Sequence, residues 1–181
     1  MQNLELYKFP KGFRGRNKMA VQLWWIVQAS LFRISPQALY GWRRFLLRLF
    51  GARIGKKVLV RPSAKITYPW KVSIGDHSWI GDEVTLYSLG DISIGHSTVV
   101  SQRSYLCAGS HVYTKIDFPI YADPIRIGNG CWIATDVFVG PGVQVGDGAV
   151  VGARSSVFRS LEGMGVCMGS PAKFIKTGKI E

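Results

Sequence analysis

A six-residue period runs through most of the 181-residue chain. Aliphatic residues occupy it at fifteen positions: Ile54, Val60, Ile66, Ile74, Ile80, Leu86, Ile94, Val100, Leu106, Ile127, Ile133, Val139, Val145, Val151 and Val157. Glycine is the next residue at eight of them. The period matches neither the roughly 3.6 residues of a helical turn nor the two-residue alternation of a strand. It predicts a solenoid in which each hexapeptide forms one flat face.

The hexapeptides fall into groups of three. Ile54, Ile74 and Ile94 are spaced twenty residues apart, which leaves three hexapeptides and two additional residues for each turn. Three flat faces make a triangular coil, so the pattern predicts an all-β parallel β-helix of about five coils. We expect the glycines to turn the corners with a positive φ.

One insertion interrupts the period. Ile94 and Ile127 are thirty-three residues apart, fifteen more than three hexapeptides need, and the excess follows the third face of the third coil. A flat β-helix surface offers no pocket, whereas a projecting loop can make one, and functional residues concentrate on such loops. His111, in "LCAGSHVY", lies at the base of this loop and is the candidate catalytic residue.

The repeat [LIV]-G-x-x-[small]-x and the ending "VCMGSPAKFIK" resemble the hexapeptide-repeat acyltransferases. Within them, "LYGWRRFLLRLFGARIGKKVLVRPSAKITYPWKVSIGDHSWIGDEV" is similar to the colanic-acid-type O-acetyltransferases of bacterial exopolysaccharide biosynthesis. The resemblance implies a left-handed β-helix with acetyl-CoA as donor and a sugar hydroxyl of a polysaccharide precursor as acceptor. It also implies a homotrimer with its active sites between subunits.

In that family a histidine acts as general base, a role that the resemblance transfers to His111. Histidine suits the task, because its ordinary pKa of about 6.5 lets it accept a proton from a hydroxyl near neutral pH. Cys107 lies four residues away and is a conceivable nucleophile, but the family transfers the acyl group directly between substrates.

The resemblance also implies a set of residues for acetyl-CoA. The segment "CWIATDVF" places an oxyanion-binding backbone N–H at Thr135 and a pantetheine-lining side chain at Trp132, with Ala134 where the family usually has glycine. The other CoA-contacting positions fall on Ala153, Arg159, Lys173 and Lys176. Arg and Lys side chains pair with phosphate.

The acceptor site is less clearly marked. In "LYSLGD" the close family often has asparagine where this chain has Ser88, so the candidate acceptor residues are Tyr87, Ser88 and Asp91. A serine hydroxyl can still donate or accept a hydrogen bond, with a shorter reach.

We expect no metal. A zinc-dependent γ-carbonic anhydrase on this fold would need three convergent histidines, and the spacings of His77, His96 and His111 do not bring their rings together. Cys107, Cys131 and Cys167 form no CxxC pair, which favours reduced thiols in the cytoplasm. We also expect no secretory signal, and the apolar run of residues 19–32 is too short to span a bilayer.

The N-terminal third differs from the rest. Residues 1–60 hold twelve Lys and Arg and one acid, Glu5. The excess of basic residues therefore lies in this segment. We expect no nucleic-acid partner. We divide the chain into a helical segment, residues 1–51, and the β-helix domain, residues 52–181. Two helices are expected within residues 18–50, the second starting at Pro36 with Ser35 as its cap and ending at Gly51.

The second helix is amphipathic and basic. One face carries Leu39, Trp42, Phe45 and either Leu46 or Leu49, and Arg43, Arg44 and Arg48 lie elsewhere. It can close the open first coil of the solenoid or rest on an anionic membrane. We expect a cytoplasmic O-acetyltransferase, which would lie at the inner face of the membrane if the helix rests on lipid. Two alternative functions remain. One is a non-catalytic trimeric scaffold or membrane-surface binding module, and the other is an acyltransferase for a different small acceptor.

Overall fold

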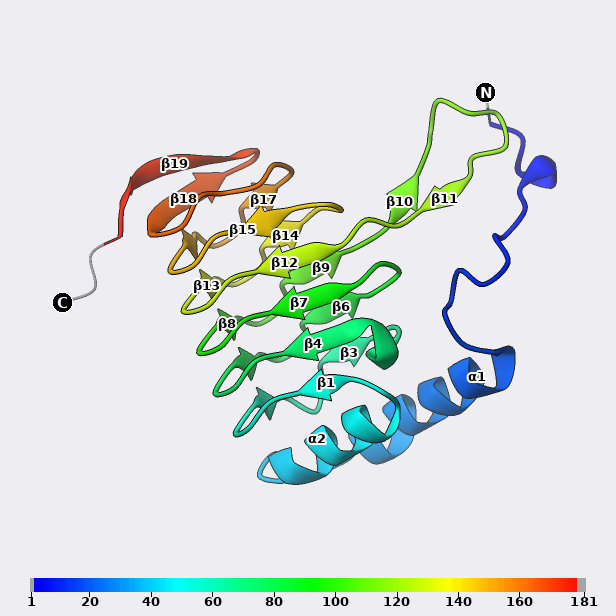
Figure 1. Cartoon of the computed structure of the whole chain (residues 1–181), viewed down its shortest axis with the longest axis horizontal. Helices are drawn as coiled ribbons and strands as arrows, with labels where there is room; N and C mark the ends of the chain where they lie inside the picture. The colour runs from blue at the N-terminus through cyan, green and yellow to red at the C-terminus, as the bar shows by residue number, and fades with distance from the viewer. Residues whose placement is uncertain (1, 179–181) are drawn as a thin grey trace.

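The computed structural model describes residues 2–178 and consists of a triangular parallel β-helix with a pair of helices at its N-terminal end (Figure 1). Sheet A contains β1 (Arg53–Ile54), β4 (Val72–Ile74), β7 (Ile92–Ile94), β12 (Ile125–Ile127) and β15 (Gln144–Val145). Sheet B contains β2 (Leu59–Val60), β5 (Trp79–Ile80), β8 (Val99–Val100), β13 (Trp132–Ile133), β16 (Val150–Val151), β18 (Gly165–Gly169) and β19 (Ala172–Thr177). Sheet C contains β3 (Lys65–Ile66), β6 (Thr85–Tyr87), β9 (Tyr105–Cys107), β14 (Phe138–Val139) and β17 (Ser156–Val157).

Each complete coil passes through sheets A, B and C in turn, which confirms the triangular β-helix and its five coils. A partial sixth coil follows, in which Leu161 bridges to Val145 and β18 pairs with β16. Strand β19 then reverses direction and pairs antiparallel with β18. The five coils therefore end in a β-hairpin.

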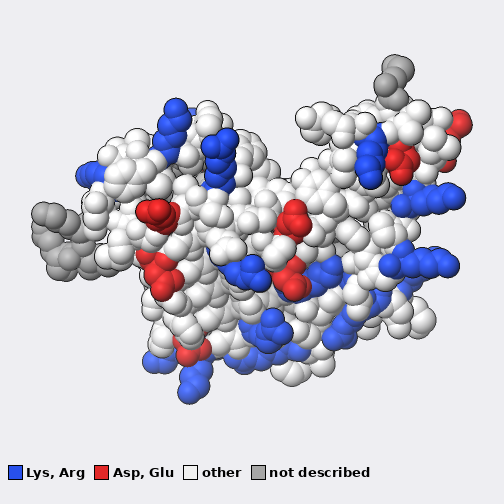
Figure 2. Space-filling view, turned by 45° about the horizontal axis from the view of Figure 1, so that its top comes forward, with Lys and Arg blue, Asp and Glu red and all other residues white. Residues whose placement is uncertain are grey.

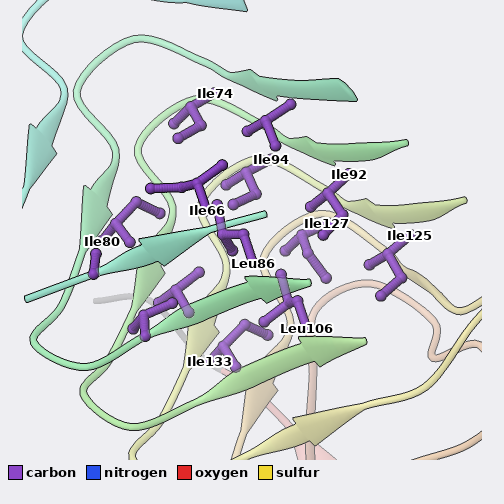
Figure 3. Close-up of a cluster of buried hydrophobic side chains, with 14 of the residues drawn as sticks. Ile66, Ile74, Ile80, Leu86, Ile92, Ile94, Leu106, Ile125, Ile127 and Ile133 are labelled. Carbon is purple, nitrogen blue, oxygen red and sulfur yellow. The ribbon is translucent and has the colours of Figure 1, made fainter. Parts of the chain in front are cut away.

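The aliphatic grid forms the core. Parallel pairing aligns each grid residue with the next, as in Ile54 with Ile74. The side chains of Ile74, Ile94 and Ile127 stack in this way inside the triangle (Figure 3). Ile80, Leu86 and their equivalents are almost completely buried. Each such side chain stabilises the fold by roughly 1.5–3 kcal/mol relative to exposure.

The glycines after the grid residues have a different role from the one expected. The positive φ angles lie two residues further on, at Lys57, His77, Ser97 and equivalent positions. A Cβ on Gly75 would lie 2.7 Å from both the carbonyl carbon of Gly95 and the backbone nitrogen of His96. Glycine is present because the next coil passes too close for a side chain. The sequence prediction of a positive φ at these glycines was therefore wrong.

The N-terminal segment contains α1 (Lys18–Val27), a π-helical turn η2 (Gln28–Phe32) and α2 (Tyr40–Leu49). A short 3-10 helix, η1 (Leu4–Leu6), precedes them, and another, η3 (Pro69–Lys71), lies at a coil corner. The second helix ends at Leu49, and Gly51, the expected stop, follows two residues later with a φ of 94°. It begins at Tyr40 and not at Pro36, and the Ser35 hydroxyl donates to the carbonyl of Phe32 instead of capping it.

The helix pair covers the first coil with its arginine side chains facing inward. Arg43 is completely buried, and its Nε donates to the carbonyl of Val60 at 2.6 Å. Arg44 donates to the carbonyl of Val58, and Arg48 donates to that of Ile54. These carbonyls lie at the open edge of the first coil, where no preceding strand pairs with them. The arginines therefore satisfy the edge of the β-helix, which is the capping role considered from the sequence.

The inserted residues form a projecting hairpin. Strands β10 (Ser110–His111) and β11 (Ile120–Tyr121) pair antiparallel, and the hairpin extends away from the coils in Figure 1. It leaves the corner between sheets C and A, where sheet C strand β9 ends and sheet A strand β12 begins. No helix within residues 2–178 has the length and apolar character needed to cross a membrane.

Candidate active site

His111 is held in one orientation by the hairpin. Its Nδ1 lies 2.9 Å from the backbone carbonyl oxygen of Phe118, and the imidazole stacks on the Phe118 ring at a centroid distance of 4.3 Å and an angle of 7°. Because a carbonyl oxygen can only accept, Nδ1 is the nitrogen that bears hydrogen in the neutral ring. Nε2 is then left with a lone pair that can take up a proton.

A main-chain carbonyl, and neither Asp117 nor Asp123, thus orients His111. The sequence left this point open, since both acids lie on the same insertion. The hairpin brings Phe118 back beside His111 because β10 pairs with β11, so that His111 lies opposite Ile120, two residues after Phe118.

The N-terminal strap, residues 2–17, also reaches this hairpin. The Asn3 N–H donates to the carbonyl of Ile116 at 2.7 Å, and the Tyr7 ring lies 6.0 Å from that of His111. Lys71 holds the strap against the β-helix by donating to the carbonyl of Phe13 at 2.8 Å. Sequence reasoning missed Tyr7, because a residue about one hundred positions away gives no periodic signal.

The candidate acceptor residues fall into two groups. Tyr87 is half-buried and Asp91 is exposed, and both lie near the corner from which the hairpin projects. Burial raises the pKa of the Tyr87 phenol, so it remains a hydrogen-bond donor at neutral pH.

Ser88 is completely buried. Its hydroxyl accepts from the Tyr68 N–H at 2.8 Å and donates to the Tyr68 carbonyl at 3.0 Å. Both hydrogen bonds join neighbouring coils, which leaves the hydroxyl no access to an acceptor sugar. Ser88 is therefore a structural residue, and we remove it from the acceptor set.

Cys107 does not have the surroundings of a nucleophile. Burial raises the pKa of its thiol, and Sγ lies 3.1 Å from the carbonyl of Gly109. A reactive cysteine needs a lowered pKa, because the thiolate is the attacking species. The site thus favours direct transfer.

Three of the candidate CoA residues, Trp132, Thr135 and Ala153, lie on sheet B or at its corner with sheet C. Trp132 is half-exposed on the outer face of sheet B, where its Nε1 donates to the Ser101 hydroxyl at 3.0 Å. Thr135 and Ala153 occupy equivalent positions of successive coils at the corner between sheets B and C. Their backbone N–H groups find no hydrogen-bond acceptor within residues 2–178, so both can donate to a ligand.

The charged candidates are exposed near the C-terminal end. Arg159 follows β17, and Lys173 and Lys176 lie on β19. Ala134 stands where the family usually has glycine, and its N–H donates to Val151 as in the other coils. The local backbone is therefore kept despite the additional methyl group.

One chain does not bring His111 and Trp132 together. His111 lies at the corner between sheets C and A, and sheet B, with Trp132, forms the opposite side of the triangle. A shallow groove of about 670 Å³ runs over sheet A, and none of the candidate residues lines it. Residues 2–178 also hold no cluster of three His, Cys, Asp or Glu that could bind a metal ion.

Comparison with known proteins bears on the family of the chain. The family model described as bacterial transferase hexapeptide (six repeats) matches residues 124–159. A putative colanic acid biosynthesis acetyltransferase, WcaF of Escherichia coli (strain K12), is 62% identical over 97% of both chains. The chain belongs to the hexapeptide-repeat acyltransferases. Within that family it is of the colanic-acid acetyltransferase type, as the sequence predicted.

Solved structures share the fold of this hexapeptide-repeat acyltransferase. A galactoside acetyltransferase in complex with coenzyme A has a TM-score of 0.81 at 24% identity, covering 93% of this chain and 83% of that one. A hexapeptide-repeat acetyltransferase of Vibrio cholerae O1 biovar eltor, complexed with acetyl-CoA, has a TM-score of 0.80 at 22% identity, covering 90% and 89%.

Proposed function

We propose that the protein transfers an acetyl group from acetyl-CoA to a sugar hydroxyl of a polysaccharide precursor. The observation that carries the proposal is the orientation of His111, which leaves Nε2 available as a base on a projecting hairpin. The relative named for colanic acid biosynthesis supports a saccharide acceptor, and the two neighbours that hold CoA or acetyl-CoA support the donor.

The reaction needs one base and one oxyanion donor. Nε2 of His111 removes the proton from the sugar hydroxyl as its oxygen attacks the thioester carbonyl. The Thr135 N–H donates to the carbonyl oxygen as negative charge develops on it. The carbon–sulfur bond then breaks, and the CoA sulfur takes the proton from His111. The products are the sugar ester and free CoA, with no acyl-enzyme.

The remaining candidates hold the two substrates. Trp132 lines the pantetheine arm, and the Ala153 N–H donates to one of its amide carbonyls. Arg159, Lys173 and Lys176 pair with the phosphates of CoA. Tyr87 and Asp91 contact the acceptor, and Tyr7 is added to them because it lies beside His111.

We infer a homotrimer, because the site is complete only between two copies of the chain. The hairpin of one subunit would place His111 over sheet B of the next, where Trp132 and Thr135 lie. Such closed symmetry repeats one interface three times and so forms three sites. The reaction is placed in the cytoplasm, at the inner face of the membrane, where lipid-linked precursors are accessible. The three free cysteines agree with a reducing compartment.

The test is release of CoA thiol from acetyl-CoA in the presence of free or lipid-linked oligosaccharides. Wild-type protein should turn over, and His111→Ala should lose about 100- to 10,000-fold in rate while still binding acetyl-CoA. His77→Asn is the matched control, since His77 is an exposed corner residue with a positive φ that asparagine tolerates. Full activity of His111→Ala would remove histidine as the base. Absence of turnover on every hydroxyl acceptor would favour a scaffold.

A further inference from the structure

The helix pair presents an apolar surface to solvent. Met19, Leu23 and Ile26 of α1, Ile34 of the connection, and Phe45 and Leu49 of α2 are each more than half exposed. We call these six residues the outer helix face. The opposite side of each helix, with Trp24, Leu46 and Leu47, belongs to the core cluster shared with the first coil. The outer helix face therefore points away from the β-helix.

The inner side of α2 carries both apolar and arginine side chains. Leu46 and Leu47 of α2 are buried against the first coil, and Arg43, Arg44 and Arg48 donate to its backbone carbonyls. The open edge of the first coil includes the backbone carbonyls of Ile54, Val58 and Val60, which need hydrogen-bond donors. Arginine supplies these donors, while Phe45 and Leu49 are exposed on the other side of α2.

The surroundings of the outer helix face are basic. Lys18 and Arg33 are exposed on the helical segment, and Lys56 and Lys57 are exposed at the adjacent corner of the first coil. Glu5 is the one acid among residues 1–60. Lys and Arg gather along the lower margin of the view in Figure 2. An apolar surface bordered by cations has the chemistry of an interfacial segment that binds anionic lipid.

We propose that the outer helix face docks on an anionic lipid bilayer. The apolar side chains enter the boundary between head groups and acyl chains, and the neighbouring Lys and Arg contact lipid phosphates. The two ten-residue helices are too short to cross the bilayer and suit a position in its plane. A second copy of the chain is a poorer occupant, since it would bring the same positive charge to the same surface. The proposal does not depend on the reaction assigned to His111.

Sedimentation of the full chain with vesicles tests this docking. Wild-type protein should bind vesicles of phosphatidylcholine with phosphatidylglycerol, bind pure phosphatidylcholine weakly, and lose binding as salt rises. The variant Ile26→Gln/Phe45→Gln should bind anionic vesicles on the order of 100-fold more weakly. The matched control is Ile175→Gln/Phe158→Gln, which changes the same residue types at similar exposure near the other end of the β-helix.

Three results would overturn the proposal. The first is absence of wild-type binding to anionic vesicles, and the second is equal loss of binding in both double variants. The third is a change of molar mass in solution for Ile26→Gln/Phe45→Gln, which would make the surface a contact between copies. Circular dichroism establishes whether each variant is folded. Should the apolar variant not fold, Lys18→Gln/Arg33→Gln replaces it and must also weaken anionic binding.

Discussion

Nδ1 of His111 lies 2.9 Å from the carbonyl oxygen of Phe118, whose ring stacks on the imidazole. One residue thereby supports both the tautomer and the plane of the proposed base. Phe118 itself has a φ of 45°, which is uncommon for a large side chain. The hairpin must hold this conformation to keep the carbonyl directed at Nδ1.

Substituting Phe118 by glycine removes the stacked ring but keeps the carbonyl and suits the positive φ. We expect kcat to fall about 10- to 100-fold with little change in the KM for acetyl-CoA, because the imidazole loses its alignment. Steady-state kinetics measures this difference. Tyr113→Gly, at an exposed position of the same hairpin, should retain wild-type kcat. Equal kcat in wild type and Phe118→Gly would show that stacking does not position the base.

Mixed trimers test whether the site lies between subunits. His111→Ala and Trp132→Ala would each impair all three sites of a uniform trimer. If the two residues of one site come from different chains, random mixing in equal amounts restores about one quarter of the sites. The measurement is kcat/KM of co-expressed variants against the separately purified proteins. No recovery in verified mixed trimers would place both residues in one chain.

If Lys173 and Lys176 bind the phosphates of CoA, their replacement should impair only donors that carry those phosphates. Lys173→Ala/Lys176→Ala should raise the KM for acetyl-CoA roughly tenfold or more, because charged donors to phosphate are lost. The same variant should use acetylpantetheine, which lacks the nucleotide phosphates, as well as wild type does. Lys56→Ala/Lys65→Ala, exposed on the first coil, is the control. An equal effect on both donors would point to a structural role for the two lysines.

Replacement of Arg43 is expected to destabilise the fold. The Arg43 guanidinium is buried and donates to Val60, Ser35, Pro36 and Gln37. Arg43→Ala leaves several of these acceptors unsatisfied, and we expect the free energy of unfolding to fall by about 3 kcal/mol or more. Urea unfolding measures the change. The exposed Arg33→Ala should stay within about 0.5 kcal/mol of wild type. A similarly small effect at Arg43 would contradict its role as a cap.

The ion pair between Arg103 and Asp136 is expected to stabilise the fold in a pH-dependent way. Arg103 donates to both carboxylate oxygens of Asp136, at 2.7 and 2.8 Å, and lowers the pKa of Asp136 below its ordinary 3.8. A lowered folded-state pKa means that the contribution is present above pH 3.8 and is lost as pH falls through the folded value.

Asp136→Asn should therefore have a lower Tm than wild type at pH 7, and the difference should disappear in strong acid. Thermal unfolding between pH 7 and pH 2 follows it. Asp123→Asn is the control, since Asp123 makes no ion pair within residues 2–178. A Tm difference for Asp136→Asn that is constant over the whole range would exclude the ion pair as its cause.

The β-helix could be predicted from the sequence because its core repeats. Ile74 and Ile94 occupy equivalent places in successive coils, so a spacing of twenty residues translates directly into a stack. The physical reason for glycine at position 75 could not be read in the same way. It depends on the distance between the backbone at Gly75 and the backbone at Gly95 in the next coil. That distance is set by the packing of the coils and leaves no pattern in the sequence.

The candidate site was predictable in part. The insertion marked His111, but the Phe118 carbonyl and the Tyr7 ring reach it through strand pairing and through the strap, neither of which leaves a pattern in the chain. Ser88 was misassigned because burial of its hydroxyl between coils is a tertiary property. Hydrophobicity alone likewise does not anticipate that Arg43 donates to the carbonyl edge of the first coil.

The arginine cap also bears on assembly. A β-helix whose first coil kept its carbonyls open would be a template for the last coil of another molecule, and such stacking would grow into a fibre. Arg43, Arg44 and Arg48 occupy that edge, while the reversed strand β19 follows the last coils at the other end. The length of the solenoid is thus set within one chain. Insertion or deletion of whole coils between the two ends would therefore leave no additional unpaired strand edge.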